Sequence, residues 1–319
     1  MTFHAFVAPL IRARAGLPLE AAHAVTARVP LRIPSELGRE EFVLVSLVGA
    51  DEGLVAFPTG KSSGAVTAFS QADGFFAIDA LASALDADSQ VEVTLIGKSE
   101  RAPDLVIMGS HDIALDVVVG ALAGRGVRAR TIAVGSLGGC ECDIAPVHLV
   151  DPATGVYNKH LLAPGLALVP GWRRMQGLVF RPGDTRFAGR SAEAALQAAL
   201  ADPATLMVNR NAGSGTRVLI DSLLRGAKPP GYANQPRSHN AVAAAIAQHR
   251  ADWGIAIAPV ANLYGLGFLP IAPEYYDFLV VEARRQRPAV QAFIEVLRNE
   301  AVRDRIRALG MEPAAQESI

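Results

Sequence analysis

The segment DLVIMGSHDIALDVVVGALAGRGVRARTIAVGS (104–136) decides the fold class of most of the chain. Its apolar run at 104–110 predicts a buried strand, residues 111–126 predict a helix with glycine at its end, and residues 129–136 predict a second strand. Both strands end in Gly-Ser, a turn that leads from a strand into a helix. A strand, a helix and a strand in this order form the repeating unit of an α/β domain.

The same alternation continues toward the C-terminus. LMVNRNAGSGTRVLIDSLL (206–224) again leads from a strand through small residues into a helix, and SHNAVAAAIAQHRADWGIAIAP (238–259) leads from a helix back to a strand. We therefore expect an α/β domain over residues 103–319.

The first hundred residues have a different pattern. Four short runs rich in β-branched and aromatic residues are separated by Gly, Asp and Ser turns, which indicates a small β-barrel, closed or half-closed, over residues 20–98. These runs are EFVLVSL (41–47), LVAF (54–57), FFAI (75–78) and VEVTLI (91–96). Apolar residues at helical spacing in FHAFVAPLIRARAG (3–16) predict an amphipathic helix within residues 1–19.

Composition excludes several classes of function. The 319 residues include 30 Lys and Arg against 31 Asp and Glu, so no basic surplus exists to neutralise a nucleic-acid backbone. No apolar run reaches the roughly 20 residues that a bilayer-spanning helix needs, and the N-terminus lacks the order of a secretory signal. We therefore expect a cytoplasmic protein with no membrane and no nucleic-acid partner. Cys140 and Cys142 are too close in sequence for an unstrained disulfide, and the histidines lack metal-ligand spacing, so we expect reduced thiols and no metal site.

Three predicted helices of the α/β domain begin with small or hydroxyl residues. A helix start leaves four backbone N–H groups unpaired and carries about half a positive charge, so it binds anions where small side chains allow a close approach. Helix starts at the carboxyl ends of neighbouring strands can converge on one ligand. The alternative is that each serine or threonine only caps its own helix. The candidate residues are Ser110, His111, Ser136, Gly138, Gly139, Ser214, Gly215 and Thr216, with positive charge from Arg210 and Arg217.

Longer motifs resemble two known families. The α/β part is similar to the two-lobed periplasmic-binding-protein-like (PBP-like, type II) domains found with molybdenum-cofactor proteins and molybdate-type regulators. The motifs that carry this resemblance are GSHDIALD (109–116), VGSLGG (134–139), CDIAPVHLVDPATGVYN (142–158), VNRNAGSGTRVLID (208–221), SHNAVAAAIAQHRADWGIAI (238–257) and GLGFLPIAPEYYD (265–277). The first part resembles the C-terminal barrel (domain IV) of MoeA-type molybdopterin molybdotransferases, through AHAVTARVPLRIPSELGREEFVLVSL (22–47) and PTGKSSGAVTAFSQADGFFAID (58–79).

The resemblance implies an arrangement of lobes and a ligand. The first lobe would hold about 103–187 and 263–319, and the second about 188–262. An oxyanion, molybdate or tungstate, or a molybdopterin-like ligand would bind in the cleft between them. His111, His239 and Tyr276 are the groups expected to touch a pterin ring, and Arg39 and Ser63 are carried over as site residues of the barrel.

Two functions remain open at this point. In the first, the protein belongs to molybdenum cofactor biosynthesis and binds a small anionic ligand without making or breaking a bond, so it has no catalytic residue. In the second, it is a non-catalytic part of a split or truncated molybdopterin molybdotransferase, because the catalytic domain of that family would lie upstream of Met1. Activity would then need a separate catalytic domain as a partner. A homodimer is the other assembly considered.

Overall fold

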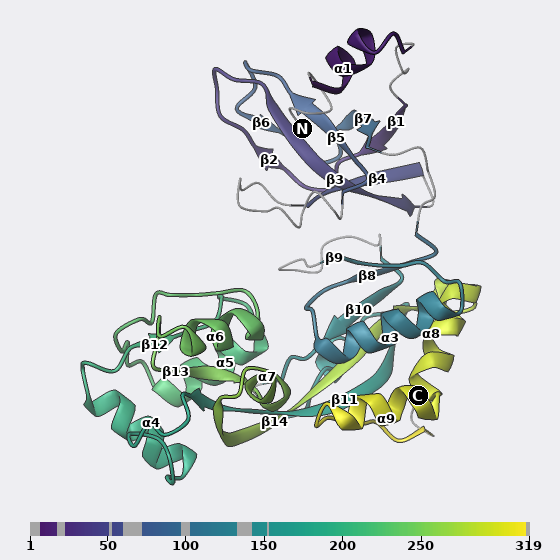
Figure 1. Cartoon of the computed structure of the whole chain (residues 1–319). Helices are drawn as coiled ribbons and strands as arrows, with labels where there is room; N and C mark the ends of the chain where they lie inside the picture. Colours follow the sequence, from purple (N-terminus) through teal and green to yellow (C-terminus); the bar gives the residue numbers. More distant parts are fainter. Residues whose placement is uncertain are drawn as a thin grey trace. The chain divides into compact units, whose positions relative to one another are not determined.

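The computed structural model describes residues 7–17, 23–50, 53–59, 72–96, 103–132, 142–151 and 153–316. The chain divides into two compact units, one ending at Pro103 and the other beginning at Asp104 (Figure 1). The first unit contains α1 (Ala8–Arg14), β1 (Ala24–Arg28), β2 (Ile33–Pro34), β3 (Glu41–Ala50), β4 (Gly53–Pro58), β5 (Gly74–Ile78), β6 (Ala84–Leu85) and β7 (Gln90–Leu95).

The first unit is a closed barrel with the strand order β1-β4-β3-β5-β7. Every one of the four predicted runs lies in a strand, and the predicted barrel is confirmed. Alternate residues of β3, namely Val43, Val45 and Leu47, are buried in the barrel core, as the twofold repeat of a strand requires. Helix α1 also forms, but none of its residues is buried.

The second unit contains an eight-stranded sheet with seven strands in the order β12-β13-β11-β14-β10-β8-β9, while β15 pairs with β11. Residues 104–132 form β8, α3 and β9, with β8 parallel to both β9 and β10, and residues 133–136 of the predicted second strand lie outside the described residues. The strands are β8 (Leu105–Met108), β9 (Ala129–Ile132), β10 (Ile144–Val147), β11 (Leu166–Phe180), β12 (Met207–Val208), β13 (Trp253–Ile257), β14 (Gly267–Val281) and β15 (Glu312–Pro313). The helices are α3 (Ile113–Gly124), α4 (Ala192–Ala201), α5 (Gly215–Leu224), α6 (His239–Ala247), α7 (Ala258–Leu263), α8 (Pro288–Arg298) and α9 (Glu300–Ala308), with short 3₁₀ turns at Lys159–Leu161 and Glu282–Arg284.

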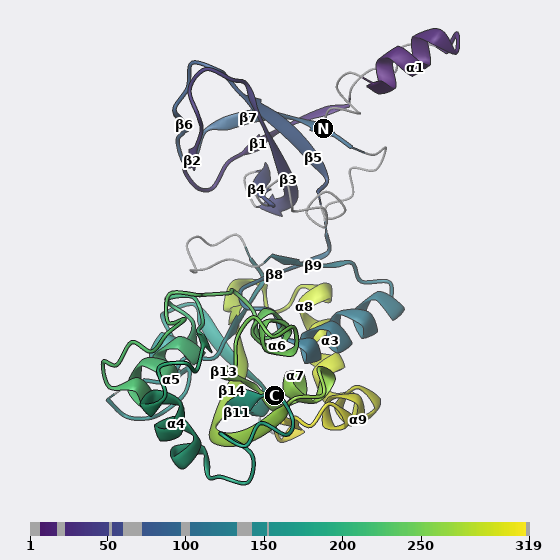
Figure 2. The same cartoon turned by 60° about the vertical axis from the view of Figure 1, so that its left-hand side comes forward.

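The unit has two lobes, each with its own large hydrophobic core, and a smaller cluster packs α6 against β12 and β13 (Figure 2). The first core packs α3, α8 and α9 against β8, β10 and the C-terminal part of β14. Leu115, Phe278 and Phe293 are fully buried in it. The second core gathers α4, α5 and β13 around Phe180 and Trp253.

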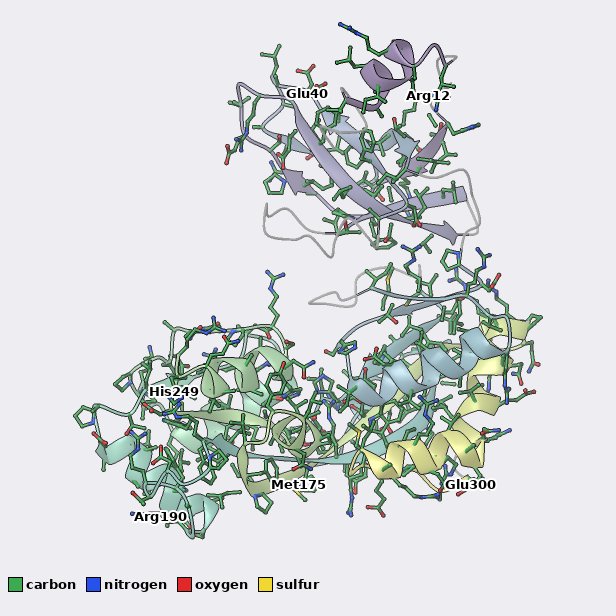
Figure 3. All side chains as sticks on the ribbon, viewed as in Figure 1. Arg12, Glu40, Met175, Arg190, His249 and Glu300 are labelled. Atoms are coloured by element: carbon green, nitrogen blue, oxygen red, sulfur yellow. The ribbon has the colours of Figure 1, made fainter. Side chains whose placement is uncertain are left out.

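The long strands β11 and β14 connect the lobes as an antiparallel pair, because each contributes residues to both cores. Leu178 at one end of β11 belongs to the second core, whereas Val169 near its other end belongs to the first. Figure 3 shows Met175 of β11 between His249 in one lobe and Glu300 in the other. Register shifts interrupt the pairing between Val169 and Trp172 and again between Gln176 and Gly177. Because these two strands join the lobes, we infer that the ribbon acts as the hinge between them, and we call β11 and β14 the hinge strands.

Within the described ranges, no helix combines the length and apolar character needed to cross a bilayer. Cys142 is buried, and Cys140 lies outside the described residues.

Candidate functional site

A buried network of charges lies where the two lobes meet the hinge strands. Arg174 of β11 donates from Nε to Oε2 of Glu274 on β14, with 2.6 Å between the two atoms. The same guanidinium also pairs with Asp112, the N-cap of α3. The second carboxylate oxygen of Glu274 lies 2.9 Å from Nδ1 of His148, which follows β10. All four side chains are at most 6% exposed, so the network joins β10, β11, β14 and α3 away from water.

Glu274 is ionised in this network. Burial alone would raise its pKa, but the positive charge of Arg174 and the contact with His148 outweigh burial and bring the pKa to about 2. Asp112 also accepts a hydrogen bond from the backbone N–H of Ala114 at 2.7 Å. Arg174 is therefore offset by two carboxylates, each of which has other donors as well.

Arg210, which follows β12, differs from Arg174 because it has no acidic partner among the residues described in the structure. Its residue is 6% exposed, and its Nη2 donates to the carbonyl of Arg237 at 3.2 Å. Its Nε and Nη1 are buried and have no partner in the described part of the chain. Burial first, and then the positive charge of Arg174, lower the pKa of Arg210 to about 10. A buried guanidinium with two free N–H faces is a strong anion-binding group.

Two further polar groups near Arg210 are also unpartnered in the region described. Thr216, in the first turn of α5, is fully buried with a free Oγ1, and His239, the first residue of α6, is 7% exposed with a free Nδ1. Burial, followed by the charges of Arg210, Arg174 and His148, holds the pKa of His239 well below its ordinary value of 6.5. His239 is therefore a neutral imidazole. Because the charges of Arg210 and Arg174 both lower its pKa, His239 lies close to these two arginines.

The start of α5 approaches the network very closely at Gly215. A Cβ at this position would lie 2.6 Å from the carbonyl oxygen of His148 and 3.4 Å from Oε1 of Glu274. Only glycine lets the first turn of the helix come this near. The close approach brings the positive end of α5 to the buried charges.

A small cavity separates the starts of α3 and α6. Its volume is about 10 Å³, close to the space for a single water molecule. The lining residues are His111, Asp112, Ile113, Ser238, His239, Asn240, Ile257 and Val260. The side chains of Ser214 and Ser238 accept backbone N–H groups three residues on, so both serines cap their helices.

The other predicted residues have partners within the protein. Arg217 donates from Nε to Asp221 at 2.8 Å, from Nη1 to the carbonyl of Arg210 at 3.0 Å and from Nη2 to the hydroxyl of Tyr232 at 2.6 Å. These contacts hold the loop that carries Arg210, and they leave Arg217 a structural role. Ser214 also donates to the carbonyl of Asn211 at 3.0 Å.

The residues proposed to touch a ring are placed differently from one another. Tyr276 is fully buried, stacked between Trp172 and His148 with ring centroids 5.0 and 5.8 Å away, and its hydroxyl donates to the carbonyl of exposed Ser110. Its ring therefore has no free face. His111 lines the small cavity with His239, and its hydrogen bond to Asp116 at 2.9 Å raises its pKa.

The remaining predicted residues belong to other places in the chain. Arg39 forms an ion pair with Glu36 at 2.5 Å on the surface of the barrel, with 68% of its side chain exposed. Ser63, Ser136, Gly138 and Gly139 lie outside the described residues.

Sequence reasoning did not find the network itself. Arg174 lies in none of the quoted motifs, and His148 and Glu274 lie in two of them (142–158 and 265–277) but are not among the predicted site residues. The three residues come from two long strands and a loop far apart in the sequence, so no local pattern joins them. The only local signal was at Asp112, whose carboxylate directly precedes a helix and therefore predicts an N-cap.

Comparison with known proteins agrees with this architecture. The family model of the PBP superfamily domain matches residues 119–298, more than half of the chain. The chain belongs to the PBP superfamily. The barrel matches the model of the MoeA C-terminal region (domain IV) over residues 26–96, so both resemblances seen in the sequence are confirmed.

Several individual proteins are similar to this PBP-superfamily protein. A putative phosphate ABC transporter substrate-binding protein from Clostridium perfringens, solved with bound phosphate, is 12% identical, with a TM-score of 0.51 over 66% of this chain and 99% of that one. The tungstate-binding protein TupA from Desulfovibrio alaskensis is 18% identical, with a TM-score of 0.45 over 67% of this chain and all of that one. The uncharacterized protein YvgK of Bacillus subtilis is 30% identical over 170 residues, 50% of this chain. The chain spans about half the length of that curated relative, 53%.

Proposed function

We propose that the PBP-like domain binds a small tetrahedral oxyanion between the starts of α5 and α6, with Arg210 as its principal charged contact. Thr216 and His239 supply the neutral hydrogen bonds, and the backbone N–H groups at the start of α5 complete the site. The observation that carries the proposal is the guanidinium of Arg210, which is buried and has no carboxylate partner within the described ranges. Burying such a charge is costly, and an anion is the partner that offsets the cost.

The space beside His239 favours an oxyanion over a pterin. The cavity between α3 and α6, which His239 lines, has room for about one water molecule, and the ring of Tyr276 is fully buried. A bicyclic ring would need the lobes to move far apart, whereas a tetrahedral anion needs only a small opening at the hinge strands β11 and β14.

The chemical class of the anion is part of the same proposal, and it is inferred from solved proteins of similar fold. We assign it to the class of molybdate, tungstate and phosphate, since solved relatives of the fold are named for tungstate or hold phosphate. The match of the barrel to the MoeA C-terminal region supports a role in molybdenum cofactor biosynthesis, and therefore molybdate or tungstate as the ligand.

The test is thermal unfolding and isothermal titration calorimetry of the full chain with molybdate, tungstate, phosphate or sulfate at matched ionic strength. An anion at 100 times its Kd stabilises the folded state by about 2.7 kcal/mol, which raises Tm by roughly 5–10 °C for a domain of this size. The stabilisation should disappear in Thr216→Val and in Arg210→Met. It should persist in Arg190→Ala, an exposed arginine of the same lobe. If none of the four anions shifts Tm or releases heat, the oxyanion proposal is wrong.

A further inference from the structure

A second pocket of the PBP-like domain lies on the other face of β14 from the proposed anion site. Its volume is about 550 Å³, within the usual range for small-molecule sites. Successive residues of a strand point to opposite faces. Glu274 and Tyr276 accordingly face the charge network, whereas Tyr275 and Asp277 line this pocket. The pocket is therefore separate from the oxyanion site and does not depend on the function proposed for that site.

Aromatic and apolar side chains form the walls. Tyr157 and Tyr275 stand with ring centroids 5.5 Å apart, and Trp172 lines the same pocket. Tyr275 is 43% exposed, and so is the neighbouring Val156, which leaves an aromatic and apolar surface open to the pocket. Pro313 closes the wall from β15. Flat aromatic ligands are the molecules that such walls bind best.

One acidic group lies among these apolar walls. Asp277 is 9% exposed and has no cationic partner among the side chains described; its oxygens accept from Nδ2 of Asn158 at 2.7 Å and from the backbone N–H of Gly171 at 3.1 Å. A carboxylate has about four lone-pair positions, so it can accept further N–H donors. Burial raises its pKa, as expected for an acid whose charge is only partly compensated.

One further group of the pocket is available to a ligand. Lys159 lines the pocket, is exposed and has no ion-pair partner among the described residues. The pocket thus offers a carboxylate acceptor and an exposed cation beside aromatic walls.

We propose that this pocket binds a flat heteroaromatic ring with an amino-lactam edge, the arrangement found in guanine and in pterins. The ring packs against Tyr275 and Tyr157, and its N–H and NH₂ groups donate to Asp277. Lys159 contacts an anionic substituent, such as a phosphate, where the ligand has one. A carboxylate suits this edge because it accepts two parallel N–H donors, which a purely apolar ring cannot provide.

Isothermal titration calorimetry of the full chain with pterin (2-amino-4-oxopteridine) and guanosine tests the proposal. Lumazine, which has an oxygen in place of the 2-amino group, is the matched ligand control. We expect saturable binding of the two amino-lactam rings and at least tenfold weaker binding of lumazine, since one hydrogen bond to a charged group is lost. No saturable heat with either amino-lactam ring, or lumazine binding as tightly as pterin, would overturn the proposal.

Protein variants separate this pocket from any other binding surface. Asp277→Asn should weaken pterin binding at least tenfold, and Tyr275→Leu should weaken it about two- to tenfold through lost stacking. Tyr264→Leu replaces a tyrosine of similar exposure that follows α7 and should bind pterin like the parent. Asp277 also accepts a hydrogen bond from Asn158, so Asp277→Asn is informative only if its Tm equals that of the parent. If that variant is destabilised, Tyr275→Leu alone decides the test, because Tyr275 is partly exposed. Parental affinity in Tyr275→Leu together with parental affinity in a folded Asp277→Asn would refute the assignment.

Discussion

Replacing Arg210 by methionine should stabilise the empty protein while it abolishes oxyanion binding. The pKa of Arg210 falls from an ordinary range above 12 to about 10, because burial and the charge of Arg174 disfavour the guanidinium. Two or more pKa units correspond to about 3 kcal/mol against the charged form at neutral pH. The variant loses one hydrogen bond, from Nη2 to the carbonyl of Arg237, which is worth about 1 kcal/mol. Methionine keeps the packing of the aliphatic stem.

The expected net effect is a gain of about 2 kcal/mol, or a rise in Tm of roughly 4–8 °C for a domain of about 200 residues. Differential scanning calorimetry without added anion measures it. The matched control is Arg181→Met, because the guanidinium of Arg181 bonds to the carbonyls of Ile246 and Ala251 and to Asp252. That variant should lower Tm, since it leaves buried acceptors unpaired.

The reasoning fails if Arg210→Met lowers Tm as Arg181→Met does. Such a result would mean that Arg210 has a compensating partner in the folded protein, and its buried charge would then no longer indicate an anion site. A higher Tm with unchanged anion affinity would confirm that the buried charge is destabilising, but it would show that Arg210 does not contact the anion.

Three further predictions concern the same site. Gly215→Ala should destabilise the protein by about 1–3 kcal/mol in chemical denaturation, despite the better helix propensity of alanine, because its Cβ would collide with the backbone of His148. An unchanged midpoint would show that α5 is less tightly docked. Glu274→Gln should cost about 3–5 kcal/mol, since it leaves Arg174 partly uncompensated; a loss below 1 kcal/mol would contradict the ion network. The free energy of unfolding should fall as the pH drops below about 6.5. In this range His239 binds a proton in the unfolded chain but not in the folded protein, where burial lowers its pKa, and the loss continues as the pH falls toward that lowered pKa. Urea unfolding from pH 7.5 to 5.5 measures this slope, and an equal slope in His239→Gln would exclude His239 as its source.

The general architecture follows from local patterns in the sequence. The switch from runs of short strands to an alternation of strands and helices separates the barrel from the α/β part, and small residues with serine mark helix starts. These signals are short-range, since a strand, a cap and a turn each depend on a few neighbouring residues. Arg210, Thr216 and His239 could be selected for the same reason, because they stand at or just before helix starts.

The charge network could not be predicted in this way. Arg174 lies in the run WRRMQ (172–176), where a charged residue predicts the solvent face of a strand. It is buried because Glu274 lies beside it in the β11–β14 pairing, a contact between residues 100 positions apart. Arg217 illustrates the opposite case. Its position at a helix start suggests a ligand contact, but Tyr232 and Asp221 occupy its donors.

The position of the network explains how a buried anion site can open. Arg174 and Glu274 are direct partners in the register of the two hinge strands, so their ion pair survives a rotation of the lobes about that ribbon. Asp112 ties the pair to α3 of the first lobe, whereas Arg210 belongs to the second lobe and is held there by the carbonyl of Arg237. In this proposal, opening exposes Arg210 to water and lowers the cost of its charge, whereas closing without an anion buries that charge again. The guanidinium has no acidic partner among the described residues, so closure would depend on the ligand, because an anion offsets the cost of burying the charge.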